Sequence, residues 1–119
     1  MEIKTHYDSE DDVLTIFSDV APKETIEFAD FLNIDISKKK DIVGIELFDA
    51  SEFFGKPSKK ITKDFLSNIK EVKINYDEWR NNWFINIELI DKNNNKIEQK
   101  LPPLKKSEYT SPLIASVSN

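Results

Sequence analysis

Apolar and polar residues alternate with a period of two along much of the chain, which is the pattern of half-buried β-strands. In the first half this alternation predicts four strands, over residues 3–7, 13–17, 25–37 and 41–48. Asp30 interrupts the apolar face of the third strand, so we expect a bend or bulge near residues 29–31. Polar turns follow the first and third strands, and the economical interpretation is two consecutive hairpins.

The second half of the chain returns to the same alternation. It predicts three further strands, over residues 71–79, 83–90 and 96–101. The segments between these strands are rich in Asn, whose short side chain bonds to the nearby backbone and so favours turns. The two halves together give about seven antiparallel strands, arranged as two β-meanders.

Two short helices are expected between the meanders. Asp49 is a suitable N-cap for the first helix, and Glu52 stands three residues later, where it completes a capping box. Gly55 can adopt the left-handed conformation that ends a helix. Thr62 can cap the second helix. The polar residues at the start of the first helix are therefore explained by capping rather than by a site.

These elements predict the α+β class, with antiparallel β-meanders and two helices in one domain over residues 1–103. We expect a helical linker over residues 55–70 and the second meander over residues 71–103. Residues 104–119 are polar, rich in Ser and without periodicity, which predicts a flexible C-terminal tail.

Composition narrows the chemistry that the chain can carry. Its 119 residues suffice for one domain that folds without a disulfide or a metal. The absence of cysteine excludes disulfides, thiolate metal sites and a cysteine nucleophile. No apolar run approaches the roughly 20 residues of a membrane-spanning helix, so we expect a cytoplasmic protein without a membrane partner.

Charge is distributed unevenly between the two halves. Residues 1–55 hold 14 acidic and 5 basic residues, whereas residues 56–119 hold 8 acidic and 12 basic residues. Such an asymmetry can mark a charged partner, but we interpret it as a solvated surface on which charges are unevenly distributed. Only one basic residue is an arginine, which argues against sequence-specific DNA recognition.

Two segments of the first half resemble a known family. They are HYDSEDDVLTI, which begins at His6, and DIVGIELFDAS, which begins at Asp41. The positions that carry the likeness are Tyr7, Asp8, Glu10, Asp12, Leu14, Ile16, Ile42, Val43, Gly44, Ile45, Glu46, Ala50 and Ser51. Over roughly residues 3–54 the chain resembles the domain of unknown function 2283 family. The resemblance implies a small antiparallel sheet with a helix and, by association, a partnership with small toxin-like proteins. It implies no catalytic residues.

Chemical motifs are few. The acidic turn over residues 8–12 could bind a hard cation, but it lacks the Gly and the distal Glu of an EF-hand loop, so we interpret it as a solvated hairpin turn. His6 has no nucleophile motif beside it and is expected to be structural or on the surface. Gly44 marks a close approach in mid-strand, which we assign to the ring of Tyr7 or Phe53. We predict no catalytic residue, no metal and no cofactor.

The stretch YDEWRNNWF gathers aromatic residues and the arginine around one turn, and both residue types are enriched at binding hot spots. We predict binding through Tyr76, Trp79 and Arg80, and we place Trp83 in the core. The predicted function is a non-enzymatic protein-interaction module, antitoxin- or inhibitor-like, that binds an unknown protein partner and itself as a homodimer.

Two alternatives stay open. The basic and aromatic second half could bind single-stranded nucleic acid, for which we expect a continuous stripe of Lys70, Lys73, Arg80 and exposed aromatic rings. The acidic turn could instead serve a small acid–base or metal-dependent enzyme, for which carboxylates should converge with His6 in a cleft.

Overall fold

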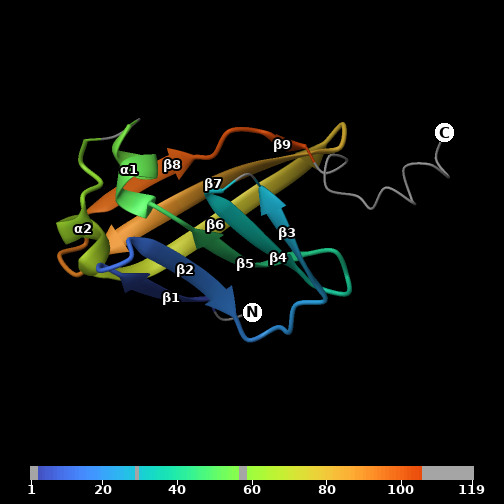
Figure 1. Ribbon diagram of the computed structural model, residues 1–119, viewed down its shortest axis with the longest axis horizontal. Helices are drawn as coiled ribbons and strands as arrows, with labels where there is room; N and C mark the ends of the chain where they lie inside the picture. The colour runs from blue at the N-terminus through green and yellow to red at the C-terminus, as the bar shows by residue number, and fades with distance from the viewer. Residues whose placement is uncertain (1–2, 29, 57–58, 106–119) are drawn as a thin grey trace, which may run out of the picture.

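The strands form two antiparallel sheets in a computed structural model, which describes residues 3–28, 30–56 and 59–105 (Figure 1). Sheet A has the spatial order β1 (Ile3–Asp8), β2 (Val13–Ser18), β5 (Ile42–Leu47), β4 (Leu32–Ile36) and β3 (Glu24–Phe28). Sheet B consists of β6 (Ile69–Trp79), β7 (Asn82–Asp91) and β8 (Lys96–Lys100), and β9 (Leu104–Lys105) pairs with the start of β7. Helices α1 (Ala50–Gly55) and α2 (Lys63–Ser67) connect the sheets.

The two sheets pack against each other around one apolar core, with sheet A in front of sheet B in Figure 1. Alternate residues of each strand enter this core, as the period-two pattern requires. The ring of Phe28 meets the ring of Trp83 edge-on, with 6.0 Å between the ring centroids. Trp83 is 2% exposed, which confirms its predicted place in the core. Both helices lie at one end of the molecule, opposite the β6–β7 turn (Figure 1).

The predicted α+β class, with antiparallel sheets and two short helices between the halves, is confirmed, but the strand count is corrected. The described residues form nine strands instead of about seven. The expected long strand over residues 25–37 is a hairpin of β3 and β4, because Phe28 pairs with Leu32 and the chain turns between them. The irregularity in pairing lies instead between Asp35 and Ile36. The second additional strand is β9.

The first two residues of the predicted tail belong to the fold. Leu104 and Lys105 pair with Trp83 and Asn82, and Leu104 is buried in the core. Residues 106–119 lie outside the described residues. Within the described ranges, neither helix is long and apolar enough to cross a membrane.

The predicted caps of α1 are wrong, whereas that of α2 is confirmed. Asp49 is in the left-handed conformation, with φ 52° and ψ 46°, and its side chain makes no capping hydrogen bond. Gly55 does not have a positive φ, so it does not end α1 as a left-handed residue. At α2 the Phe65 N–H donates to the Thr62 hydroxyl over 3.2 Å, as expected of an N-cap.

The close approach at Gly44 is made by a carboxylate and not by an aromatic ring. A Cβ atom at this position would lie 2.7 Å from Asp35 Oδ2 and 3.3 Å from Asp35 Cβ. Gly44 and Asp35 are directly paired on β5 and β4. The Thr25 hydroxyl holds the Asp35 carboxylate in place with a 2.5 Å hydrogen bond. The missing side chain therefore makes room for a polar contact on the outer face of sheet A.

Candidate functional site

The β6–β7 turn presents the most exposed aromatic residue among the described residues. Trp79 is 62% exposed and ends β6. The Arg80 guanidinium carbon lies 4.5 Å from the centroid of the Trp79 ring, within the range of a cation–π contact. Arg80 and Asn81 both have positive φ, 49° and 63°, as the two-residue hairpin turns that suit the twist of a β-ribbon require. The geometry of the turn therefore fixes the direction in which the Arg80 and Asn81 side chains project.

Phe84 extends this exposed aromatic surface along β7. It pairs with Asp77, and Trp79 pairs with Asn82, so these side chains share the outer face of sheet B. Phe84 is 40% exposed. We call Trp79, Arg80, Phe84 and Asp77 the tip surface. Phe84 was not among the binding residues predicted from the sequence, although its position out of phase with Trp83 and Ile85 places it on the outer face.

A shallow depression of about 260 Å³ adjoins the tip surface. Its lining includes Phe84 and Asp77 together with Asn75, Asn86, Ile85, Lys100 and Leu101. The Asn86 side-chain oxygen is buried and accepts no hydrogen bond from the described residues. The tip surface thus combines exposed rings, a cation, a carboxylate and amide groups.

The structure separates Tyr76 from Trp79 and Arg80. Tyr76 lies on the inner face of β6, where its hydroxyl accepts a 3.2 Å hydrogen bond from the Ile42 N–H. The same hydroxyl donates to the Asp41 carboxylate over 3.4 Å. Tyr76 therefore joins sheet B to the start of β5 and does not reach the tip surface.

The acidic turn is tied to α1 through Asp12. The Asp12 carboxylate accepts hydrogen bonds from the Tyr7 hydroxyl at 2.5 Å, the Ser51 N–H at 3.0 Å and the Ser51 hydroxyl at 2.7 Å. The Asp12 carbonyl oxygen also accepts from the Ala50 N–H at 2.9 Å. We call Tyr7, Asp12 and Ser51 the clamp. It satisfies the first N–H groups of α1, the task that the sequence assigned to Asp49.

The clamp shifts the pKa values of its two acids in opposite directions. Burial acts to raise the pKa of Asp12, but the hydrogen bonds from Tyr7 and Ser51 outweigh it and hold that pKa below its usual value. Burial, the hydrogen bond to Asp12 and the nearby negative charges raise the pKa of Tyr7. The clamp is therefore a neutral phenol donating to an ionised carboxylate at neutral pH.

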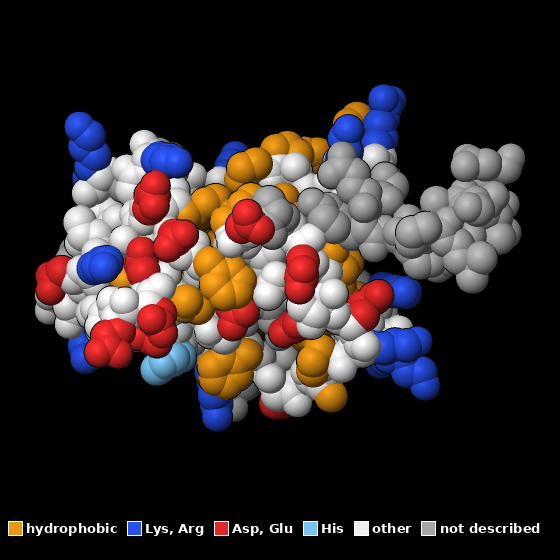
Figure 2. Space-filling view, in the orientation of Figure 1, with side chains coloured by type: hydrophobic (Ala, Val, Ile, Leu, Met, Phe, Trp, Pro, Cys, Tyr) orange, Lys and Arg blue, Asp and Glu red, His pale blue; other side chains and the backbone are white. Residues whose placement is uncertain are grey.

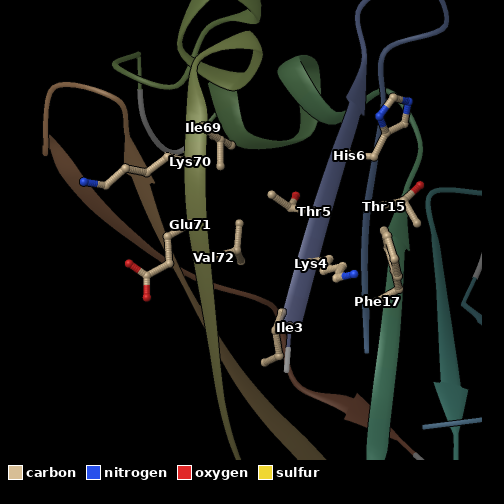
Figure 3. Close-up of a pocket in the computed structure, with 10 residues that line it drawn as sticks. All are labelled: Ile3, Lys4, Thr5, His6, Thr15, Phe17, Ile69, Lys70, Glu71 and Val72. Atoms are coloured by element: carbon tan, nitrogen blue, oxygen red, sulfur yellow. The ribbon is translucent and has the colours of Figure 1, made fainter. Parts of the chain in front are cut away.

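An open cleft of about 720 Å³ lies between β1 and β6 (Figure 3). In the figure Thr5, Ile69 and Val72 point into the gap, and the Thr5 hydroxyl is buried without a hydrogen-bond partner among the described residues. His6 projects from the other side of β1, and Lys70 points away from the gap (Figure 3). The titratable groups of the cleft do not converge on one point.

The described residues do not gather metal-ligating side chains at one place. No group of three or more His, Asp or Glu side chains there is placed to hold a metal ion. In the acidic turn, Asp8 accepts hydrogen bonds from the Glu10 and Asp11 N–H groups, so its carboxylate shapes the turn.

The segment of the chain that contains the clamp matches a known sequence family. Residues 4–51 match the family described as protein of unknown function DUF2283. The resemblance inferred from the sequence is confirmed. The DUF2283 segment comprises the strands of sheet A from Lys4 onward and the first two residues of α1, and it includes all three clamp residues. Sheet B and the tip surface lie outside it.

A longer match is to Uncharacterized protein MJ0789 of Methanocaldococcus jannaschii. The two are 34% identical over 67 residues, which cover 56% of this chain. The matched region is 57% of that relative, so the chain spans little more than half of its length. No solved structure matches the chain.

Proposed function

We propose that the chain is a non-enzymatic protein-interaction module that binds its partner through the tip surface. The observation that carries this proposal is the 62% exposure of Trp79, with Arg80 stacked on its ring. An exposed tryptophan loses apolar hydration when a partner covers it, and Trp and Arg are the residue types that dominate binding energy at interfaces. An antitoxin- or inhibitor-like protein would use such a surface to cover its target.

The tip surface is also well supported by the fold. β7 is paired on both sides, with β6 along its length and with β8 and β9 on the other edge. The turn contains only two residues, and Arg80 already contacts Trp79. A preorganised surface loses less conformational freedom on binding, which favours affinity.

The non-enzymatic part of the proposal rests on the acidic turn. Asp12 is committed to the clamp and Asp8 to the turn backbone, so their carboxylates already have structural partners. His6 lies exposed on the opposite side of β1 from Thr5. These placements favour a structural role for the turn over acid–base chemistry.

Single-stranded nucleic acid is the alternative partner. Lys73 shares the outer face of β6 with Trp79, which favours stacking and phosphate contacts. Asp77 lies between these two residues on the same face, and Glu88 is paired opposite Lys73. The interrupted positive charge favours a protein partner, and nucleic acid becomes an outcome of the test.

Self-association accompanies the proposal, with a homodimer as the expected state. β1 and β3 are the outer strands of sheet A, and β6 and β8 are those of sheet B. An outer strand offers backbone groups that a second copy can pair. Light scattering should give twice the 13.8 kDa chain mass at micromolar concentration, and the single mass would contradict the homodimer.

Photocrosslinking from the tip tests the main proposal. A photoreactive phenylalanine analogue at position 79 should capture a discrete protein from an extract of the cells that produce the chain. The matched control carries the analogue at Phe17, which is 41% exposed on sheet A. Capture at 79 but not at 17 that survives nuclease treatment supports the proposal. A nuclease-sensitive adduct or equal capture at both positions would contradict it.

A further inference from the structure

The outer face of sheet A is acidic and carries exposed rings. Figure 2 shows Asp and Glu side chains interspersed with hydrophobic side chains across this face, with most Lys and Arg side chains at its periphery. Glu46 and Asn33 are paired on this face, and Asn33 donates to Glu46 over 3.4 Å. This face belongs to the half of the chain in which acidic residues outnumber basic ones by 14 to 5.

A pocket of about 260 Å³ lies where this sheet meets α1. Phe31, Phe48 and Phe53 supply its apolar lining. The rings of Phe31 and Phe53 are stacked, with 5.3 Å between centroids and 19° between planes. The Phe48 N–H donates to the Phe31 carbonyl over 2.9 Å, which fixes the backbone on both sides of the pocket.

Two carboxylates and one ammonium complete the lining. They belong to Asp49, Glu52 and Lys56, all of which are exposed. The Asp49 side chain does not cap α1. The ion pairs between described residues use other carboxylates, those of Glu24, Glu88 and Glu98. The pocket therefore has a net negative rim around aromatic rings.

We propose that this pocket accepts a Lys or Arg side chain from a basic segment of a protein partner. A cation gains from the faces of aromatic rings and from a carboxylate at the same time. An anion would be repelled, and an uncharged side chain would cover the rim without neutralising it. The molecule already contains one cation on an aromatic ring, Arg80 on Trp79. This site is separate from the tip surface and does not depend on the function proposed for it.

A charged peptide and its neutral isostere test the chemistry. The probes are hexa-arginine and hexa-citrulline, because citrulline keeps the shape of arginine without its charge. Their binding is followed by amide NMR shifts of the isotope-labelled full chain at low ionic strength. Hexa-arginine should shift Phe31, Phe53 and Glu52, and hexa-citrulline should shift none of them. Equal binding of both peptides would overturn the proposal.

Two variants that each remove two carboxylates distinguish binding in the pocket from nonspecific electrostatic attraction between the peptide and the acidic chain. The variant Asp49→Asn/Glu52→Gln should weaken hexa-arginine binding by about tenfold, because it removes both carboxylates that would contact the bound cation. Asn is suited to position 49 because it tolerates a positive φ. The control Glu10→Gln/Asp11→Asn removes the same charge from the acidic turn and should leave binding within about twofold, the scale of an exposed charge contact. Equal losses in the two variants would show diffuse electrostatics and overturn the proposal.

Two further readouts address the rings and the occupant. Phe53→Leu keeps an apolar residue but removes one ring face, and should also weaken hexa-arginine binding while the melting temperature confirms that the variant is folded. Unchanged affinity in folded Phe53→Leu would count against the aromatic contact. Pocket shifts that appear when the chain is concentrated without peptide would assign the pocket to a second copy and would overturn the proposed partner.

Discussion

The Asp12 carboxylate accepts hydrogen bonds from both the backbone N–H and the hydroxyl of Ser51, at 3.0 Å and 2.7 Å. The β1–β2 turn therefore caps a helix that lies far along the sequence. A third bond from the Tyr7 hydroxyl orients the same carboxylate. We expect Asp12→Ala to reduce the free energy of unfolding by about 1.5–3 kcal/mol, because it leaves donors at the start of α1 without a charged acceptor. Urea denaturation measures this loss.

The control for this prediction is Asp11→Ala. Asp11 is adjacent in the same turn, and its side chain is exposed. It should change the free energy of unfolding by no more than about 0.5 kcal/mol, as exposed positions usually do. Equal effects of the two substitutions would show that the clamp contributes nothing beyond the turn itself.

The clamp also predicts how stability depends on pH. The folded pKa of Asp12 lies below its usual value, so its contribution is present above the unfolded pKa of about 4 and is lost as pH falls through the folded pKa. The folded pKa of Tyr7 is raised, so its contribution is present below about pH 10 and is lost at higher pH.

Asp12→Asn isolates the acidic limb of that profile. The difference in unfolding free energy between the native chain and this variant should be constant from pH 5 to pH 8 and should shrink below about pH 4. Denaturation midpoints across that range measure it. A difference that grows as pH falls would mean that another group sets the acid limb.

The sequence predicts a helix cap correctly where the capping residue is close in the sequence, and fails where the cap comes from a distant residue. Thr62 caps α2 through a residue three positions away, and a local pattern predicted it correctly. Asp49 and Glu52 have the same spacing, yet Asp49 adopts a left-handed backbone and its side chain does not cap. The acceptor that replaces it comes from Asp12, across the sheet. A sequence pattern cannot show which of two aspartates a folded chain brings to a helix.

The missed hairpin has a geometric explanation. Phe28 and Leu32 are paired across the β3–β4 turn, four positions apart. An even spacing keeps apolar residues in phase, so Ile26 and Ile34 continue one alternation through a turn that contains neither Gly nor Pro.

The exposure of Trp79 was easier to predict from the sequence, because the strand pattern placed Trp79 with Lys73 on the polar face of β6.

Asp49 leads to a prediction about backbone conformation rather than capping. A residue with φ 52° other than Gly, Asn or Asp is disfavoured by about 1–2 kcal/mol. Asp49→Ala should therefore lower the free energy of unfolding by about that amount, whereas Asp49→Gly and Asp49→Asn should be nearly neutral. Chemical denaturation of a further variant, Asp49→Ser, distinguishes the two causes. Ser caps a helix about as well as Asp but does not favour a positive φ, so backbone strain predicts a loss of stability and a capping role predicts none.

Gly44 and Asp35 form a pair that a double-mutant cycle can measure. A Cβ at Gly44 would meet the Asp35 carboxylate at 2.7 Å and disturb its bond from Thr25. We expect Gly44→Ala to cost about 1 kcal/mol, the scale of one hydrogen bond, and to cost clearly less in an Asp35→Ala background. The same cost in both backgrounds would place the strain elsewhere on the strand.

The two tryptophans should behave in opposite ways although four positions separate them in the sequence. Trp83 is 2% exposed, its ring meets Phe28, and its indole N–H donates to Glu78 over 3.2 Å. Trp83→Ala should therefore cost about 3–5 kcal/mol of unfolding free energy, as truncation of a core tryptophan does.

Trp79 is 62% exposed, so Trp79→Ala should cost less than about 1 kcal/mol and should instead weaken binding of the captured partner. Urea denaturation of the two Ala variants checks the stability. Acrylamide quenching of Trp79 in a folded Trp83→Phe chain, which keeps an aromatic ring in the core, checks the exposure. Strong protection of Trp79 from acrylamide in the free chain would mean that its ring is already covered, and the tip surface would then lose its leading contact.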